Sequence, residues 1–160
     1  MSRNNQALPT EQQAKVIAIL NRRLADALDL QLQSRQTYWN VKGPHLMALR
    51  KLLDQIAQAV QGYANLIAER IVQLGGVAEG TAQVVARRSA LDGHALATAL
   101  GSGPIDALAQ KLTDFGRHAR YASAQASELH DAETAALLTE IGRGIDKWLW
   151  FVQTSQQPGR

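Results

Sequence analysis

Apolar residues recur every three or four positions through four long stretches of the chain, which is the spacing that places them on one face of an α-helix. The clearest stretch runs from Leu46 to Leu74 and ends at Gly75-Gly76. Its apolar positions are Leu49, Leu53, Ile56, Val60, Tyr63, Ile67, Ile71 and Leu74. The pattern predicts a long helix with one buried face, around which the rest of the chain packs.

Three further stretches show the same helical period. The first starts at Thr10, which forms a capping-box pattern with Gln13, and is expected to end near Trp39 or Val41. The second starts near Pro104, and the third follows a short turn at His130-Asp131. Together with the stretch from Leu46 they predict four long helices, the first two forming an antiparallel hairpin.

The connection across residues 77–103 is interrupted by glycines and contains a short helical candidate at Thr81 to Arg87. A connection of this length is unusual unless it crosses the bundle or has a function of its own. We therefore predict an all-α fold, a ferritin-like four-helix bundle with a long crossover that contains a short helix. The expected domain is 10–153, with a flexible N-terminal tail at 1–9 and a C-terminal tail at 154–160.

Composition narrows the function classes. The 160 residues contain no cysteine, so thiol nucleophiles and zinc–thiolate sites are excluded. The start of the chain lacks a signal pattern and no apolar run reaches membrane-spanning length, which favours a cytoplasmic protein. A net charge of +3 permits an anionic partner without requiring one. Motifs of hydrolases and nucleotide-binding enzymes are absent from the sequence.

A second, polar set of residues lies on the helix from Leu46: Arg50, Asp54, Asn65 and Glu69 fall within a sector of about 100°. Asp54 and Asn65 are about 16 Å apart along the helix axis, so one chain cannot bring all these groups to one ion. An antiparallel second copy would place Asp54 of one chain near Glu69 of the other. The spacing thus predicts a two-fold dimer contact.

Three segments resemble the Dps family, the DNA-binding proteins of starved cells: QSRQTYWNVKGPHLMALRKLLDQI, GYANLIAERIVQLGG and TAALLTEIGRGIDKWLWFVQ. The resemblance extends from about Leu8 to Gln153. It implies a ferritin-like bundle assembled into a hollow dodecamer that oxidises ferrous iron with peroxide and stores ferric mineral. It also implies a ferroxidase site between two-fold-related subunits, nonspecific DNA binding in some members, and nucleoid association.

At the family's metal-ligand positions this sequence retains only Asp54 and Glu69. Tyr38 and Arg50 replace two histidines, and Asn65 replaces an aspartate. A guanidinium has no lone pair to offer a cation, so we expect a lost or crippled ferroxidase centre. Arg50 has two interpretations: an ordinary i, i+4 ion pair with Asp54, or a cation that replaces the metal and neutralises Asp54 and Glu69 across the interface.

The resemblance also suggests where ions and DNA would meet the shell. Glu128, His130 and Asp131 fall near the turn that surrounds three-fold cation openings in Dps shells. For DNA, the candidate phosphate contacts in the tails and the crossover are Arg3, Arg87, Arg88 and Arg160.

Three hypotheses for function follow. The first is a Dps-like shell of stress protection whose interface ferroxidase centre is lost or crippled. It would serve as a structural, DNA-associated or partner shell, or mix with an active paralogue. The second is an active iron-storing protein that uses Asp54 and Glu69 with water or Tyr38, or an inner-surface site. The third is a structural shell with neither iron nor DNA activity.

Overall fold

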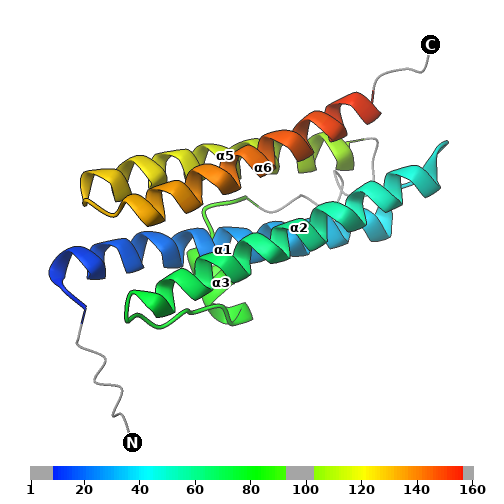
Figure 1. Cartoon of the computed structure of the whole chain (residues 1–160). Helices are drawn as coiled ribbons and strands as arrows, with labels where there is room; N and C mark the ends of the chain where they lie inside the picture. Colours follow the sequence, from blue (N-terminus) through cyan, green and yellow to red (C-terminus); the bar gives the residue numbers. More distant parts are fainter. Residues whose placement is uncertain (1–8, 93–102, 157–160) are drawn as a thin grey trace, which may run out of the picture.

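The computed structural model describes residues 9–92 and 103–156. They form five helices and, in these ranges, no strand (Figure 1). The helices are α1 (Glu11–Asn40), α2 (Leu46–Gln73), α3 (Ala82–Arg88), α5 (Pro104–Glu128) and α6 (Ala132–Ser155). The predicted all-α class is confirmed. None of these helices is both long and apolar enough to cross a membrane.

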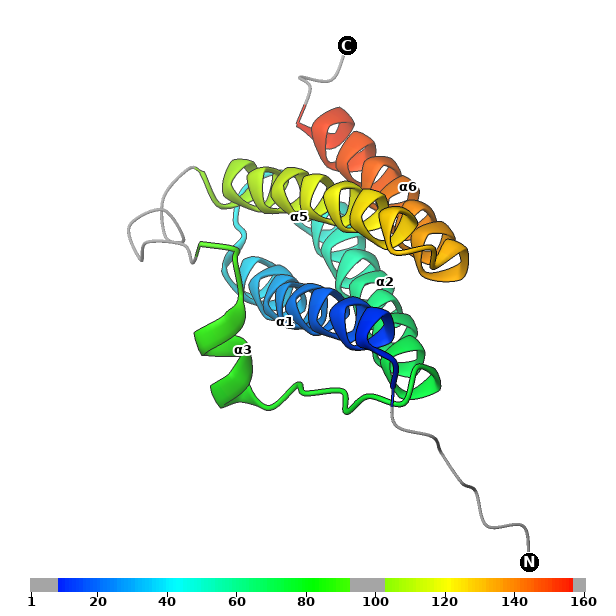
Figure 2. The same cartoon turned by 90° about the vertical axis from the view of Figure 1, so that its left-hand side faces the viewer.

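The four long helices form a bundle of two hairpins, α1 with α2 and α5 with α6 (Figures 1 and 2). Viewed from the end, α3 lies outside the bundle against α1 (Figure 2). The predicted short helix in the crossover is therefore present. The connection after α2 passes around α1 to reach it.

The predicted start of α1 is confirmed at its cap. The Thr10 backbone N–H donates to Gln13 Oε1 at 2.9 Å, and the Gln13 N–H donates to Thr10 Oγ1 at 3.1 Å. These two bonds satisfy donors that the first helical turn leaves without partners. The hairpin turn follows Asn40 and uses left-handed backbone at Gly43 (φ 111°) and His45 (φ 64°).

The core follows the predicted apolar stripes, with one shift in α1. On α2, Leu53, Ile56, Val60, Ile67 and Ile71 are fully buried. On α1 the most deeply buried line is Val16, Leu20, Leu24, Ala27 and Leu30. Ile17 and Leu28, which share the helical period of α1, are only half-buried, because they face the connection after α2 at Gly76 and Gly80 rather than the bundle axis.

Buried polar side chains of α1 hold the crossover in place. The Asn21 side chain donates to the Val77 carbonyl at 3.0 Å and accepts from the Glu79 N–H at 3.0 Å. Farther along α1, Asp29 accepts from Ser89 Oγ at 2.7 Å. The Asn21 bonds replace water for backbone groups that the packing of this segment would otherwise leave without partners, and the Asp29 bond holds the Ser89 hydroxyl.

Helices α2 and α6 approach closely where Tyr63 meets Gly144. The Trp148 indole donates to Tyr63 Oη at 3.2 Å, and burial raises the pKa of the Tyr63 phenol. A Cβ built at Gly144 would overlap Tyr63 Oη and lie 2.8 Å from its Cζ. At Gly142, two residues earlier, the nearest atom to such a Cβ is Arg120 Cγ at 3.8 Å.

We predict that Gly144→Ala destabilises the protein by about 1–3 kcal/mol, because the methyl group displaces Tyr63 and its bond to Trp148. Gly142→Ala is the matched control, and it should stabilise the helix by up to about 1 kcal/mol. Urea unfolding of both variants at one protein concentration checks this. Equal stability of the two variants would show that the close approach carries no strain.

Candidate functional site on helix α2

The predicted polar residues lie on the outer face of α2. Asn65 and Glu69 are exposed, while Arg50 and Asp54 are half-buried against α1. Tyr38 of α1 is half-buried and comes together with Arg50. One chain thus gathers Tyr38, Arg50 and Asp54 near one end of α2, with Asn65 and Glu69 farther along the helix.

Asp54 is bound by an arginine of α1 rather than by Arg50. Arg35 Nη1 lies 2.5 Å from Asp54 Oδ1, and Gln58 Nε2 donates to Asp54 Oδ2 at 2.8 Å. Of the two interpretations of Arg50, the i, i+4 ion pair with Asp54 is therefore wrong. The cause is the packing of α1 on α2, which places the Arg35 guanidinium directly against this carboxylate.

Arg50 turns toward Tyr38. Its Nε donates to the Tyr38 carbonyl at 3.3 Å, and its guanidinium carbon lies 4.9 Å from the centre of the Tyr38 ring. A cation over an aromatic face is attracted by the ring's negative centre. Within the described part of the chain, no carboxylate pairs with Arg50.

The donor set on this face does not fit a ferrous ion. Asp54 and Glu69 are about 22 Å apart along α2, so a shared ion would need a second chain. In residues 9–92 and 103–156, no group of three His, Cys, Asp or Glu side chains could hold a metal. Asp54 is paired with Arg35, and the Arg50 guanidinium, which has no lone pair to offer a cation, lies against Tyr38.

Arg35 is the residue of this site that sequence reasoning missed. It precedes Tyr38 by three positions, so both lie on one face of α1. Because Tyr38 is a candidate for this site, the spacing could have indicated Arg35 as a further member. The reach of Arg35 to Asp54 depends on helix packing and cannot be read from spacing alone.

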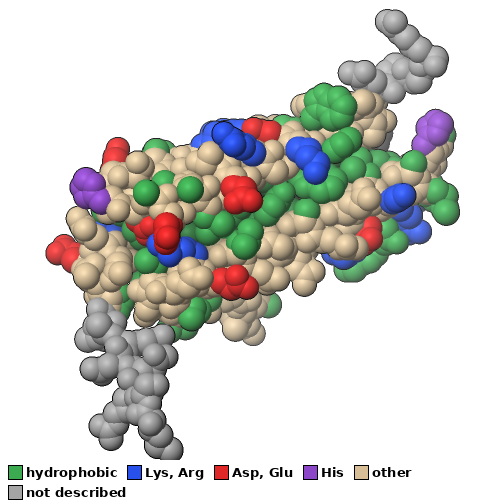
Figure 3. Space-filling view, viewed as in Figure 1, with side chains coloured by type: hydrophobic (Ala, Val, Ile, Leu, Met, Phe, Trp, Pro, Cys, Tyr) green, Lys and Arg blue, Asp and Glu red, His purple; other side chains and the backbone are tan. Residues whose placement is uncertain are grey.

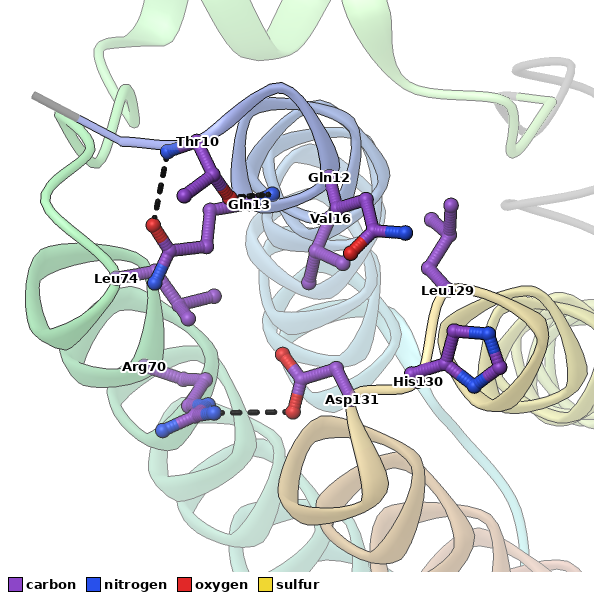
Figure 4. A pocket seen from close by; sticks show the side chains of 9 residues that line it. All are labelled: Thr10, Gln12, Gln13, Val16, Arg70, Leu74, Leu129, His130 and Asp131. Atoms are coloured by element: carbon purple, nitrogen blue, oxygen red, sulfur yellow. Dashed lines mark hydrogen bonds and ion pairs between the residues drawn. The ribbon is translucent and has the colours of Figure 1, made fainter.

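The candidate pore residues surround the turn between α5 and α6. Figure 4 shows Asp131 pointing toward Arg70, whereas His130 points away from that pair. Asp131 Oδ1 lies 3.0 Å from Arg70 Nη2 and accepts from the Thr134 N–H at 3.0 Å. Asp131 is thus used as the N-cap of α6, while Glu128 and His130 are exposed.

The stability of the folded chain is expected to depend on the protonation of Asp131 at acidic pH. Burial favours a higher pKa, but the Thr134 hydrogen bonds and the Arg70 charge outweigh it and hold the Asp131 pKa below its ordinary value. A lowered folded-state pKa means that the stabilisation is complete above about pH 4 and is lost as pH falls through the folded value. We predict that the difference in unfolding free energy between the parent and Asp131→Asn shrinks below about pH 4. A constant difference from neutral to strongly acidic pH would contradict this.

The DNA candidates are only partly covered by the described residues. Arg87 is exposed at the end of α3, and Arg88 lies beside it with Nη2 3.7 Å from Glu79. Arg3 and Arg160 lie outside the described residues. Of the four predicted arginines, the described residues therefore contain an exposed Arg87 and a half-buried Arg88 that faces Glu79.

Comparison with known proteins covers nearly the whole chain. The sequence model of the ferritin-like domain matches residues 17–157. The DNA protection during starvation protein of Agrobacterium fabrum is 35% identical over 150 residues, covering 94% of this chain and 93% of that protein. The protein of the same name from Mycolicibacterium smegmatis is 25% identical over 91% of this chain and 79% of its own length.

Solved structures give the same result for the fold. A mutant Dps1 protein of Mycobacterium smegmatis superimposes with a TM-score of 0.86, at 25% identity over 94% of this chain and all of that chain. A Dps protein from Bacillus brevis superimposes with a TM-score of 0.84, at 23% identity over 94% of this chain. The predicted ferritin-like bundle is confirmed.

Proposed function

We propose that this chain, which belongs to the Dps family of ferritin-like proteins, has lost its inter-subunit ferroxidase centre. The chain is a Dps-like protein of stress protection, as the match to DNA-protection proteins of starved cells shows. The proposal concerns which of the family's activities this chain retains. It keeps the shell-forming bundle and gives up iron oxidation at the interface.

The observation that carries this proposal is the ion pair between Arg35 and Asp54 at 2.5 Å. Asp54 is the retained carboxylate that would have to bind iron first, since both neighbouring histidines are replaced. An iron ion approaching it would have to displace a guanidinium and would meet the positive charge of Arg50 nearby. Coulomb repulsion and the lack of lone pairs both oppose binding.

The test is peroxide-driven oxidation of ferrous iron by size-resolved protein. The proposal expects a rate equal to that of protein-free buffer, and no change in Asp54→Ala combined with Glu69→Ala. The competing hypothesis, an active enzyme that uses these two carboxylates, expects a fast reaction in the parent that the double variant abolishes. A fast reaction in both proteins would locate oxidation elsewhere in the shell.

The assembly that we propose is a two-fold dimer within a dodecamer. Large apolar side chains are exposed on the single chain, among them Trp39 at 65% and Trp150 at 60%. Figure 3 shows an apolar strip running obliquely between α6 and α2. Such surfaces are typical of chains that associate. Light scattering should give the mass of twelve chains.

For DNA, we propose weak, nonspecific contacts through Arg87 and Arg88, repeated on every subunit of the shell. Repetition multiplies weak contacts, and each phosphate contact releases counterions, so binding should fall steeply as salt rises. Retardation of plasmid DNA at low salt that disappears at moderate salt supports this. Arg87→Ala with Arg88→Ala should weaken it, and equal retardation by that variant would place the contacts elsewhere.

A further inference from the structure

The outer face of α2 carries one continuous line of side chains that we name the α2 stripe. Every member is exposed or half-buried in the single chain. At 100° per residue the members fall within a sector of about 100°. The stripe is Met47, Arg50, Asp54, Gln58, Gln61, Asn65, Glu69 and Val72.

The chemistry of the stripe is symmetric about one point, midway between Ala59 and Val60. Positions equally far from that point carry matching side chains. The mates are Met47 with Val72, Arg50 with Glu69, Asp54 with Asn65, and Gln58 with Gln61. When a second α2 packs antiparallel about a two-fold axis through this point, each side chain meets its mate. Apolar groups then meet apolar groups, and the one cation meets an anion.

Of the three charged side chains of the α2 stripe, only Asp54 has an ion-pair partner among the described residues of its own chain. Asp54 is neutralised by Arg35 of its own chain. In the described residues, neither Arg50 nor Glu69 takes part in an ion pair. Tyr38 orients the Arg50 guanidinium through the ring contact at 4.9 Å. The two free charges are mates in the symmetric register.

Gly62 supplies an independent observation near the middle of the stripe's length, about 20° beyond its edge. Glycine is unfavourable inside a helix, and a Cβ built at Gly62 would meet no atom within 4 Å of its own chain. Nothing in the single chain therefore requires glycine there. A second helix passing close to the two-fold axis would require it, because a side chain would hold the two backbones apart.

We propose that Arg50 of one chain and Glu69 of a second copy form an ion pair across the two-fold axis, twice in each dimer. This inference rests on the proposed loss of iron binding, since the pair occupies two of the family's ligand positions. The pair links the two subunits without a metal. Burial at the interface raises the cost of removing or reversing one partner, because the other charge is then left buried and uncompensated.

Charge reversal tests the proposal on the full chain, without iron. Arg50→Glu alone and Glu69→Arg alone should each place like charges opposite one another and weaken subunit association by about tenfold or more. Arg50→Glu combined with Glu69→Arg should restore association to near the parent value. Sedimentation over a dilution series measures the association, and circular dichroism confirms that each variant is helical.

A matched control is Glu11→Arg, which reverses an 89% exposed charge on α1 and should leave association unchanged. A double reversal that stays as dissociated as the single variants would overturn the proposal. Single variants that associate as tightly as the parent would also overturn the proposal. This holds even if those variants lose DNA binding. These outcomes are separate from the ferrous assay: iron oxidation by the parent that Asp54→Ala combined with Glu69→Ala abolishes would refute the lost centre, whatever the charge reversals show.

Discussion

The variant carrying Tyr38→His, Arg50→His and Asn65→Asp together is expected to oxidise ferrous iron with peroxide at least about tenfold faster than the parent. It restores two imidazoles and a carboxylate at the family's ligand positions, and it removes a guanidinium from the cation site. Replacing Arg50 also frees Glu69 of the partner chain for metal. Stopped-flow oxidation kinetics on size-resolved protein measures the gain.

The gain in oxidation rate of the triple variant depends on Arg35. Arg35 remains 2.5 Å from Asp54 in the triple variant unless the new metal displaces it. Adding Arg35→Gln should raise ferrous affinity further, by roughly 10–100-fold, because a neutral amide leaves the carboxylate free. Arg35→Gln in the parent background is the control and should give no activity. If the triple variant is inactive both with and without Arg35→Gln, then residues other than these four prevent iron oxidation at the interface.

Replacing Asp26 with alanine is expected to destabilise the protein by about 3–5 kcal/mol. Asp26 is fully buried and accepts from the Ala90 N–H at 2.7 Å. Its Oδ2 also lies 3.0 Å from Arg23 Nε and 3.4 Å from His118 Nδ1. Burial lowers the pKa of Arg23 while Asp26 opposes that shift, so removing the carboxylate leaves a buried cation uncompensated.

Asp146→Ala provides the matched control for this carboxylate. Asp146 also pairs with an arginine, Arg120, at 2.5 Å, but both side chains are more than half exposed. An exposed pair of this kind contributes only about 0–1 kcal/mol. Denaturant unfolding of the two variants therefore separates burial from the mere presence of an ion pair. Similar losses of stability would contradict the role given to the buried cluster.

The bundle was predictable because local pattern and global packing agree. The apolar period of α2 fixed its buried face, and the Thr10–Gln13 capping box fixed the start of α1. The long glycine-interrupted connection indicated the crossover. In each case the signal lies within a few residues of the feature that it predicts.

The partners of the polar groups were not predictable in the same way. Asp54 has an arginine four positions away on its own helix, yet it pairs with Arg35, 19 positions away in the chain. Asp26 lies among the apolar positions of α1 and is bound 64 positions away by Ala90. A lone carboxylate on a buried stripe signals that a partner exists. Only the packing of α1 against α2 and the crossover identifies it.

The most direct test of the lost centre is the number of ferrous ions that the parent binds without oxygen. Calorimetric titration of size-resolved protein with ferrous iron measures this, with Asp54→Ala combined with Glu69→Ala as the reference. We predict that parent and reference give the same isotherm, with no stoichiometric sites at the interface. Two tight sites for each two-fold dimer, present in the parent and absent from the reference, would contradict it.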